Sequence, residues 1–485
     1  MSEKSTRKSV FGNLIWRFAE RCGAQAVSFV VAIVLARVLE PKLYGTVAMI
    51  TVITTVLSVF VDSGLGNALI QKKDADKTDF STVFYTNLVF CTALTIGLCA
   101  AAAPIARFYN DMSMVWLIRA LSLTLFVSGI KNVQQAYVSR MMQFRKFFFS
   151  TLGGTIGAAI IGIWMAYAGY GVWALVVQQV FNVTVDTVIL WITVDWRPTW
   201  EFSWQRLKGL YSYGWKLLAS ELLNTVFNQI RQPIIGKMYT AAELGLYNRG
   251  FHLPDILVSN INASISSVLF PAMSHVQDDR ERVRLMTRRS MKISVYIMAP
   301  LLIGLAAAAV TVIWLLLTDK WLDSVFYLRV ACLAFLFYPI HTANLSAIKA
   351  LGRSDIFLFL EVLKKVIDVV ILLSTMWFGV KIMALSVLFS TALSLIINAY
   401  PNKKLLDYGY HKQLGDIMPS IILACVMGAL VYGLERTGMN VGLTFALQIV
   451  VGAAVYILGS KVMRIDSYDY IVDALKPVIK RFLGK

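Results

Sequence analysis

Charged side chains recur at helical spacing inside long apolar stretches of this sequence. Arg17, Glu20 and Arg21 lie at positions i, i+3 and i+4, so one face of a helix carries all three. Glu361 and Lys364 share a helical face in the same way further along the chain. A charged group at the centre of a bilayer costs about 2.5 to 3.5 kcal/mol on the insertion scale, so such groups need water or a partner. This spacing therefore predicts polar helix faces that line a water-filled interior.

The side chains that we place on these inner faces are mainly cationic. A cavity lined with positive charge attracts anionic molecules and can hold them through charge-assisted hydrogen bonds. We therefore expect the interior to bind an anionic substrate. The candidate substrate-binding residues are Arg17, Arg21, Arg119, Lys216, Arg249, Arg329 and Lys364.

Carboxylates within the same apolar stretches are candidate sites for a coupling proton or sodium ion, because intramembrane acids commonly form ion pathways. These residues are Glu20, Asp186, Glu221, Asp255, Glu361 and Asp368. An alternative is that neighbouring opposite charges form ion pairs that only fix helix packing. Arg17 could pair with Glu20 in this way. Lys364 could pair with Glu361 or Asp368, and both interpretations stay open on the sequence alone.

The sequence contains no catalytic motif. HExxH, GxxxxGK[ST] and GxSxG are all absent, so no metalloprotease helix, phosphate-cradling loop or nucleophile elbow is predicted. The five cysteines lie inside predicted helices without CxxC spacing, and the four histidines do not cluster, so we expect neither a metal site nor a cofactor. We expect a protein that is not an enzyme and that is driven by an ion gradient or by the substrate's own gradient.

Apolar windows of about 20 residues recur along almost the whole chain, and each can cross a bilayer core of about 30 Å as a helix. Of the 485 residues, 58% are hydrophobic and 15% are charged, which is far from the balance of a water-soluble domain. The windows cover residues 14–37, 43–62, 82–105, 114–138, 146–167, 172–194, 211–231, 246–270, 288–317, 324–348, 355–377, 382–400, 414–434 and 441–460. We therefore predict an all-α integral membrane protein with about fourteen transmembrane helices.

Lysine and arginine residues are distributed unevenly between the two sides of the predicted membrane segment. With the N-terminus inside, most of them fall in the two tails and in the loops that follow even-numbered helices. The outside loops hold only Lys42, Arg107, Lys237, Lys320, Lys381 and Arg436. The positive-inside rule then places both termini in the cytoplasm. The net charge of +18 reflects this topology, and we expect no binding to nucleic acid.

An internal repeat is visible at an offset of about 200 to 210 residues. Leu43 to Gly45 matches Glu243 to Gly245, and Arg119 to Ile130 matches Arg329 to Ile340. Because six predicted helices separate equivalent points, both halves have the same orientation, as in parallel repeats about an axis along the membrane normal. We expect two six-helix bundles related by this pseudo-two-fold axis, followed by helices 13 and 14. The expected domains are an N-terminal bundle at 1–200, a C-terminal bundle at 201–404, helices 13 and 14 at 405–463, and a cytoplasmic amphipathic tail at 464–485.

Several short motifs resemble those of a known family. Val61 to Gln71, with the sequence VDSGLGNALIQ, and Asp79 to Phe84 resemble the end of helix 2 in bacterial polysaccharide flippases of the Wzx type. Gly171 to Leu175 and Ala350 to Asp355 are similar to the same family at corresponding places, as is Arg140. The resemblance runs in order through nearly the whole chain, and the first of these motifs is the most specific.

This resemblance implies a member of the superfamily that joins multidrug, oligosaccharidyl-lipid and polysaccharide exporters, with two six-helix bundles around a V-shaped cavity. It implies a cargo of oligosaccharide on undecaprenyl diphosphate, moved from the cytoplasmic to the outer leaflet of a bacterial inner membrane for capsule, exopolysaccharide or O-antigen export. A polysaccharide polymerase and the export machinery are then the expected partners. A diphosphate needs cationic groups. Those available in the expected cavity include Arg17, Arg21, Lys216 and Arg249.

Three alternatives remain beside this function. A peptidoglycan-precursor flippase differs only in its sugar cargo. A multidrug or cation antiporter of the same superfamily is expected to favour carboxylates and aromatic rings, which the excess of interior cations argues against. A membrane glycosyltransferase or polysaccharide polymerase usually needs a sizeable catalytic loop outside the bilayer, and the predicted outside loops are short.

Overall fold

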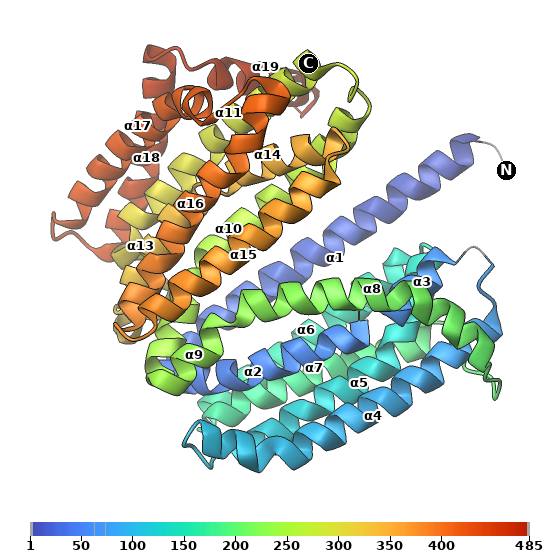
Figure 1. Cartoon of the computed structure of the whole chain (residues 1–485). Coiled ribbons are helices and arrows are strands. Elements are labelled where there is room, and N and C mark those ends of the chain that lie inside the picture. The colour runs from blue at the N-terminus through green and yellow to red at the C-terminus, as the bar shows by residue number, and fades with distance from the viewer. Residues whose placement is uncertain (1–2, 63, 73, 483–485) are drawn as a thin grey trace. The chain divides into compact units, whose positions relative to one another are not determined.

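The computed structural model describes residues 3–62, 64–72 and 74–482 (Figure 1), and the side chains discussed below are those of residues 16–17, 19–61, 64–72, 74–212, 214–473 and 476. The regular elements in these ranges are all helices, joined by turns and loops. The predicted all-α class is confirmed.

The helices have the following bounds along the chain. The first nine are α1 (Glu3–Val38), α2 (Pro41–Asp62), α3 (Leu65–Gln71), α4 (Lys77–Phe108), α5 (Met114–Arg140), α6 (Phe144–Tyr167), α7 (Val172–Thr193), α8 (Trp204–Gln229) and α9 (Arg231–Met238). They are followed by α10 (Ala241–Ser274), α11 (Arg280–Ala307), α12 (Ala309–Leu317), the 3-10 turn η1 (Asp319–Trp321), α13 (Ser324–Phe335), α14 (Tyr338–Ala350), α15 (Ser354–Thr375), α16 (Val380–Leu406), α17 (Tyr410–Glu435), α18 (Val441–Val462) and α19 (Asp466–Phe482).

Twelve helical segments in the described ranges are long and apolar enough to cross a membrane. Two of the expected spans, 211–231 and 355–377, are outside this set although the structure contains a helix at each place, α8 and α15. Both helices carry several charged residues, including Lys216 and Glu221 in α8 and Glu361 in α15. Both segments are helices of about the predicted length. Their charged residues lower their mean hydropathy.

Two expected spans are interrupted helices. The span predicted at 288–317 consists of α11 and α12, with the break at Ala308. The span predicted at 324–348 consists of α13 and α14, and Pro339 stands in the first turn of α14, where a missing backbone N–H is tolerated. An apolar window gives the length of a hydrophobic run but does not show whether the run forms one unbroken helix. The sequence pattern therefore predicted neither break.

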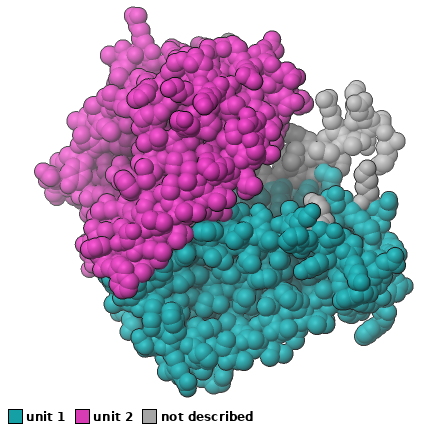
Figure 2. Space-filling view, viewed as in Figure 1, with its two compact units in different colours: residues 1–245 teal, residues 246–485 magenta. Residues whose placement is uncertain are grey.

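The chain divides into two compact units, residues 1–245 and 246–485 (Figure 2). The first unit contains α1 to α9 and the first turn of α10. The second contains the remainder of α10 and α11 to α19. Each unit is described by itself below. The four-part domain division predicted from the repeat, with its first boundary at residue 200, stays a prediction.

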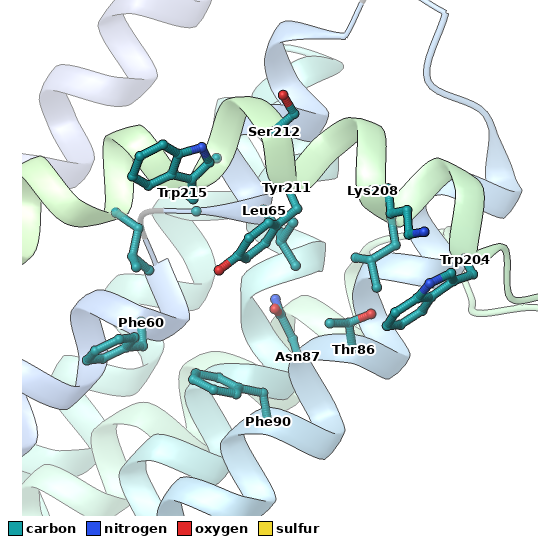
Figure 3. Close-up of a pocket in the computed structure, with 14 residues that line it drawn as sticks. Phe60, Leu65, Thr86, Asn87, Phe90, Trp204, Lys208, Tyr211, Ser212 and Trp215 are labelled. Carbon is teal, nitrogen blue, oxygen red and sulfur yellow. The ribbon is translucent and has the colours of Figure 1, made fainter.

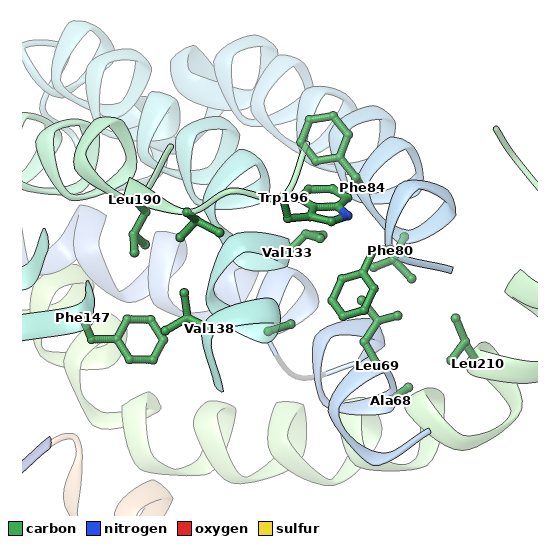
Figure 4. Packing of buried hydrophobic residues seen from close by; sticks show 13 residues of the cluster. Ala68, Leu69, Phe80, Phe84, Val133, Val138, Phe147, Leu190, Trp196 and Leu210 are labelled. Carbon is green, nitrogen blue, oxygen red and sulfur yellow. The ribbon is translucent and has the colours of Figure 1, made fainter. Parts of the chain in front are cut away.

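An aromatic core joins several helix ends of the first unit (Figure 4). Trp196, in the segment between α7 and α8, packs against Phe80 and Phe84 of α4, with ring centroids 5.9 and 6.1 Å apart. Phe80 also meets Tyr137 of α5 edge to face at 5.6 Å. Such aromatic pairs contribute about 0.5 to 1.5 kcal/mol beyond area burial. The core therefore fixes the start of α4 against the end of α5.

The short helix α3 contains most of the motif that carries the strongest family resemblance. Arg140 at the end of α5 donates a hydrogen bond to the carbonyl oxygen of Leu69 at 2.9 Å and another to that of Lys72. These bonds satisfy carbonyls at the C-terminus of α3, which lack partners inside the helix. Gly64 and Gly214 bring the start of α3 into close backbone contact with α8. The motif thus forms a tightly packed connection between α2 and α4.

The first turns of α2 and α10 cross at very short range. A Cβ atom on Gly45 would overlap the carbonyl oxygen of Ala241, and a Cβ atom on Gly245 would overlap that of Pro41. The two contacts are reciprocal, and they involve the two glycines that the sequence comparison of the halves matched. A side chain at either glycine would force the two backbones apart.

The second unit is built around α11, which packs against α13, α14 and α17. Asn344 and Gln413 exchange two hydrogen bonds of 2.9 Å, and Asn402 donates to Asn344 Oδ1 at 2.7 Å. All three side chains are buried. In a low-dielectric interior such a network holds its partners firmly, so it fixes the register of α14, α16 and α17.

The predicted C-terminal tail forms the helix α19, which packs against α11 and α18. Lys292 of α11 donates a hydrogen bond of 2.5 Å to Asp466 at the start of α19. This hydrogen bond lowers the pKa of the Asp466 carboxyl below its usual range, so Asp466 is ionised at neutral pH. The place of α19 on the inner membrane surface stays a prediction.

Candidate functional site

The polar face of α1 meets the beginning of α6. Arg17 donates a hydrogen bond to Glu20 at 2.6 Å, and Glu20 accepts another from Thr151 of α6 at 3.2 Å. The Arg17 guanidinium also lies 5.0 Å from the ring centroid of Phe147, a cation–π contact. Glu20 is buried, whereas the Arg17 side chain keeps 37% of its exposure. Arg17 is therefore held in place and still accessible to a ligand.

The other candidates of the first unit are exposed or half-buried, apart from Asp186. Arg21 of α1 and Lys216 of α8 are exposed, and neither forms an ion pair with another residue that the structure describes. Glu221 is exposed one to two turns beyond Lys216 on α8. Arg119, near the start of α5, is half-buried with its guanidinium 4.8 Å from the ring centroid of Trp116. Arg21 and Lys216 can thus bind an anion without first breaking a pair.

An ion pair joins α5 to α7. Lys131 Nζ lies 3.1 Å from Asp186 Oδ2, and the two side chains are only 15% and 11% exposed. The second carboxylate oxygen of Asp186 has no hydrogen-bond partner among the described residues. Asp186, a candidate ion-coupling residue, is therefore already compensated by a lysine from another helix.

Two arginines of the second unit lie against aromatic rings. Arg249 is buried, with its guanidinium 5.5 Å from the ring centroid of Trp321. Arg329 donates a hydrogen bond to the carbonyl oxygen of Ala306 at 3.1 Å and lies 5.4 Å from the ring centroid of Tyr432. Both guanidinium groups are positioned by cation–π packing within their own unit.

The charged face of α15 is partly paired along its own helix. Lys364 donates a hydrogen bond of 2.5 Å to Glu361 one turn earlier. Asp368 is half-buried one turn after Lys364, with Lys365 beside it. Asp255, the remaining candidate carboxylate, is exposed on α10.

The structure therefore joins some of the candidate residues into pairs. Arg17 with Glu20 and Lys364 with Glu361 have the geometry that the ion-pair alternative requires. The partner of Asp186 comes from a different helix and was not matched to it from the sequence. Substrate binding and ion coupling at these residues stay predictions, as does the shared cavity that they are expected to line.

A groove on the first unit was missed by the sequence analysis (Figure 3). It is lined by residues of α2, α3, α4 and α8, and its lining includes several aromatic rings and Lys208. One signal could have found it. Trp200, Phe202 and Trp204 cluster just before the predicted span 211–231, and such aromatic belts mark the membrane–water interface.

A comparison with protein families identifies the family of this chain. A family model described as "Polysaccharide biosynthesis protein" matches residues 34–326, which is more than half of the chain. The chain belongs to this family. The matched segment includes the α3 motif, the groove and three of the candidate cations, Arg119, Lys216 and Arg249.

The chain is similar in sequence to three bacterial proteins. It is 26% identical over 448 residues to an uncharacterized membrane protein in the cps region of Klebsiella pneumoniae, covering 89% of this chain and 90% of that protein. It is 26% identical over 322 residues to the succinoglycan biosynthesis transport protein ExoT of Rhizobium meliloti (strain 1021), covering 66% of this chain and 65% of that protein. It is 22% identical over 339 residues to the lipopolysaccharide biosynthesis protein WzxC of Escherichia coli (strain K12), covering 68% of each. The predicted resemblance to Wzx-type flippases is confirmed.

Solved structures support the fold of this family member. The structure of "Lipid II flippase MurJ, inward closed conformation" matches with a TM-score of 0.74 at 13% identity, covering 93% of this chain and 99% of that chain. At this identity the match shows the fold alone. The chain is thus a multi-pass helical membrane protein with the fold of a flippase, and its relatives are named for polysaccharide biosynthesis and transport.

Proposed function

We propose that this protein is a flippase that carries oligosaccharide repeat units linked to undecaprenyl diphosphate across a bacterial inner membrane. The cargo moves from the cytoplasmic to the outer leaflet and is then used for capsule, exopolysaccharide or O-antigen. The observation that carries the proposal is the family match over residues 34–326. The printed names of the relatives, which include a succinoglycan transport protein and a lipopolysaccharide biosynthesis protein, support it.

The proposed cargo headgroup is a diphosphate, and accessible cations on membrane helices suit it. Arg21 and Lys216 are exposed and unpaired within the described part of the chain, and Arg17 is partly exposed beside Glu20. Hydrogen bonds from charged donors to phosphate contribute about 1.5 to 3 kcal/mol each when shielded from water. Several of them together could hold the headgroup and the first sugars in an aqueous cavity while the polyprenyl chain stays in an apolar environment.

The proposed mechanism is alternating access, with the cavity opening first to the cytoplasmic and then to the outer side. Both termini lie in the cytoplasm in this proposal, as the distribution of lysine and arginine predicts. The driving force is an ion gradient or the gradient of the cargo. Exposed carboxylates such as Glu221 and Asp255 are accessible to a coupling ion, whereas Asp186 is paired with Lys131.

The function is tested in a strain that lacks the gene and is complemented by variants. We expect the deletion strain to accumulate lipid-linked repeat units on the cytoplasmic leaflet, and the unchanged protein to clear them. Accumulation of a peptidoglycan precursor instead, or loss of the repeat units themselves, would contradict the proposed cargo or indicate an enzyme.

Arg17→Ala and Arg21→Ala address the role of α1 in the same assay. We expect each to reduce export by about tenfold or more, because each removes a charge-assisted contact to phosphate worth about 1.5 kcal/mol or more. The amount of inserted protein should not change. Full export by both variants would remove α1 from the substrate site.

A further inference from the structure

The groove of the first unit is a long apolar hollow of about 1000 Å³ (Figure 3). Its walls come from the end of α2, from α3, from the first half of α4 and from the first half of α8. The lining residues that matter below are Phe60, Phe90, Trp204, Lys208, Tyr211, Ser212 and Trp215. Figure 3 shows the rings of Phe60 and Phe90 on one side of the hollow and those of α8 on the other.

The lining of the groove is suited to hydrocarbon. Five aromatic rings supply most of the large side chains among those residues, and an aromatic surface packs well against carbon chains. The polar groups are few, and two of them are engaged elsewhere. Thr86 donates to the carbonyl oxygen of Thr82, and Asn87 donates to Asn132. A sugar would therefore leave most of its hydroxyl groups without hydrogen bonds in this groove.

A second hollow of about 580 Å³ continues the groove along α4. The two share Thr86, Phe90, Trp204 and Leu207, so they form one elongated path. The lining of the second hollow includes Trp200, which is 96% exposed. The path is therefore open to the surroundings beside Trp200.

The groove lies at the membrane end that the charge distribution assigns to the cytoplasm. α2 ends there and α4 and α8 begin there. Trp200, Phe202 and Trp204 are exposed beside it, and tryptophan at such positions marks the level of the lipid headgroups. A molecule in this groove would thus be a lipid of the cytoplasmic leaflet with its headgroup near the first turns of α8.

Lys208 is the cation available for that headgroup. Its neighbour Arg206 pairs with Asp76 and lies 3.6 Å from Asp79, and Lys72 lies 2.7 Å from Asp79. The hydrogen bond from Arg206 holds the pKa of Asp76 below its usual range, so this pair is charged and compensated at neutral pH. Lys208 is exposed and forms no ion pair within the described part of the chain.

We propose that this groove binds the isoprenoid chain of the lipid carrier in the cytoplasmic leaflet, with Lys208 against the carrier phosphate. The inference rests on the proposed function, because that function supplies a polyprenyl carrier. An apolar path lined by Lys208, which has no ion-pair partner among the described residues, fits a single long hydrocarbon chain that bears a phosphate. A glycerophospholipid would bring two chains to a groove that offers one path.

The test uses the full-length protein in nanodiscs of phosphatidylcholine and a benzophenone-bearing polyprenyl monophosphate. After irradiation, the labelled peptides are identified by mass spectrometry. We expect labels on the segments around Phe90, Trp204 and Tyr211. Undecaprenyl phosphate should compete for this labelling at far lower concentration than phosphatidic acid, which carries the same phosphate monoester on two acyl chains.

Two variants probe the two parts of the site separately. Ser212→Trp fills the groove from an exposed position, and Lys208→Gln removes the charge without removing the length of the side chain. We expect each to lower labelling by about fivefold, the size of a partly exposed contact. Lys461→Gln, at an exposed position at the end of α18, is the matched control and should leave labelling unchanged. Monodisperse elution of each variant confirms that it is folded.

Labels that map outside the groove, or that neither variant reduces, would overturn the proposal. Equal competition by phosphatidic acid would also overturn it, because the groove would then be a general site for anionic lipid. The labelling needs no glycan and no transport. A protein that is labelled in the groove but fails to clear repeat units in cells would contradict the proposed function, and the groove would remain a polyprenyl site.

Discussion

Lys131 and Asp186 form a buried pair whose charges come from two different helices. Removing one partner of such a pair leaves an uncompensated charge in an apolar interior, which costs about 3 to 5 kcal/mol. Removing both leaves no charge and a surface that packs against its neighbours. The two outcomes separate a structural ion pair from a site that works through its carboxylate.

Asp186→Ala should therefore lower the thermal unfolding temperature of the purified protein in detergent. The double variant Lys131→Met with Asp186→Leu should recover most of the loss, because no unpaired charge remains. Tryptophan fluorescence during heating measures both. A single variant that unfolds at the unchanged temperature would show that this pair does not hold α5 to α7.

The sequence predicted ion pairs between neighbours on one helix better than ion pairs between residues far apart in the chain. Arg17 with Glu20 and Lys364 with Glu361 were foreseen as candidate ion pairs because a helix fixes the geometry of residues i and i+3. The partners Lys131 and Asp186 are 55 positions apart, and only tertiary packing brings them together. The shape of the groove depends on tertiary packing in the same way, because its walls come from four separate helices, and only the aromatic cluster around the start of α8 signals its place in the sequence.

At the level of helices, the first turns of α2 and α10 cross with a glycine at both contact points. Gly45 and Gly245 each face the backbone of the other helix, so neither contact can be relieved by moving a side chain. Overpacking of this kind typically costs about 1 to 3 kcal/mol.

Gly45→Ala and Gly245→Ala should each reduce export strongly and lower the unfolding temperature, because the first turns of α2 and α10 must move apart. Gly97→Ala is the matched control, since nothing lies within 4 Å of a Cβ atom there. The control should keep export and gain slightly in helix stability. Normal export by both crossing variants would show that the close approach is not required.

The apolar windows of the sequence predicted where the membrane helices lie, but they did not predict the breaks inside two of the spans. The windows at 211–231 and 355–377 coincide with α8 and α15, although neither helix is among the twelve segments apolar enough to cross a membrane. The interruptions at Ala308 and before Pro339 divide runs that stay apolar throughout. Hydropathy carries no information on such breaks, which depend on how neighbouring helices pack.

The molecule as a whole has an asymmetric distribution of positive charge that predicts its orientation. Lys381, at the start of α16, is an outside residue in this topology, and Lys404, near the end of the same helix, is an inside residue. Both side chains are exposed. Cys22 and Cys425 are also exposed and free, so a topology measurement needs a variant without native cysteines.

In that background, Lys381→Cys should react with a membrane-impermeant maleimide in intact cells. Lys404→Cys should react only after the membrane is made permeable, because the positive-inside rule places it in the cytoplasm. Gel-shift analysis measures both. The opposite pattern would invert the orientation and with it the leaflet from which cargo is taken.

The charges of α8 and α15 also bear on how the chain is made. A translocon releases strongly apolar helices into lipid one at a time, and a helix with several charges gains little from entering lipid alone. The packing partners of α8 include α2, α3 and α4, which a ribosome has already completed when α8 emerges. For α15 one principal partner, α16, is synthesised afterwards. α8 can thus pack against completed helices as it emerges, whereas α15, which also contacts α14, gains its principal packing partner only when α16 follows.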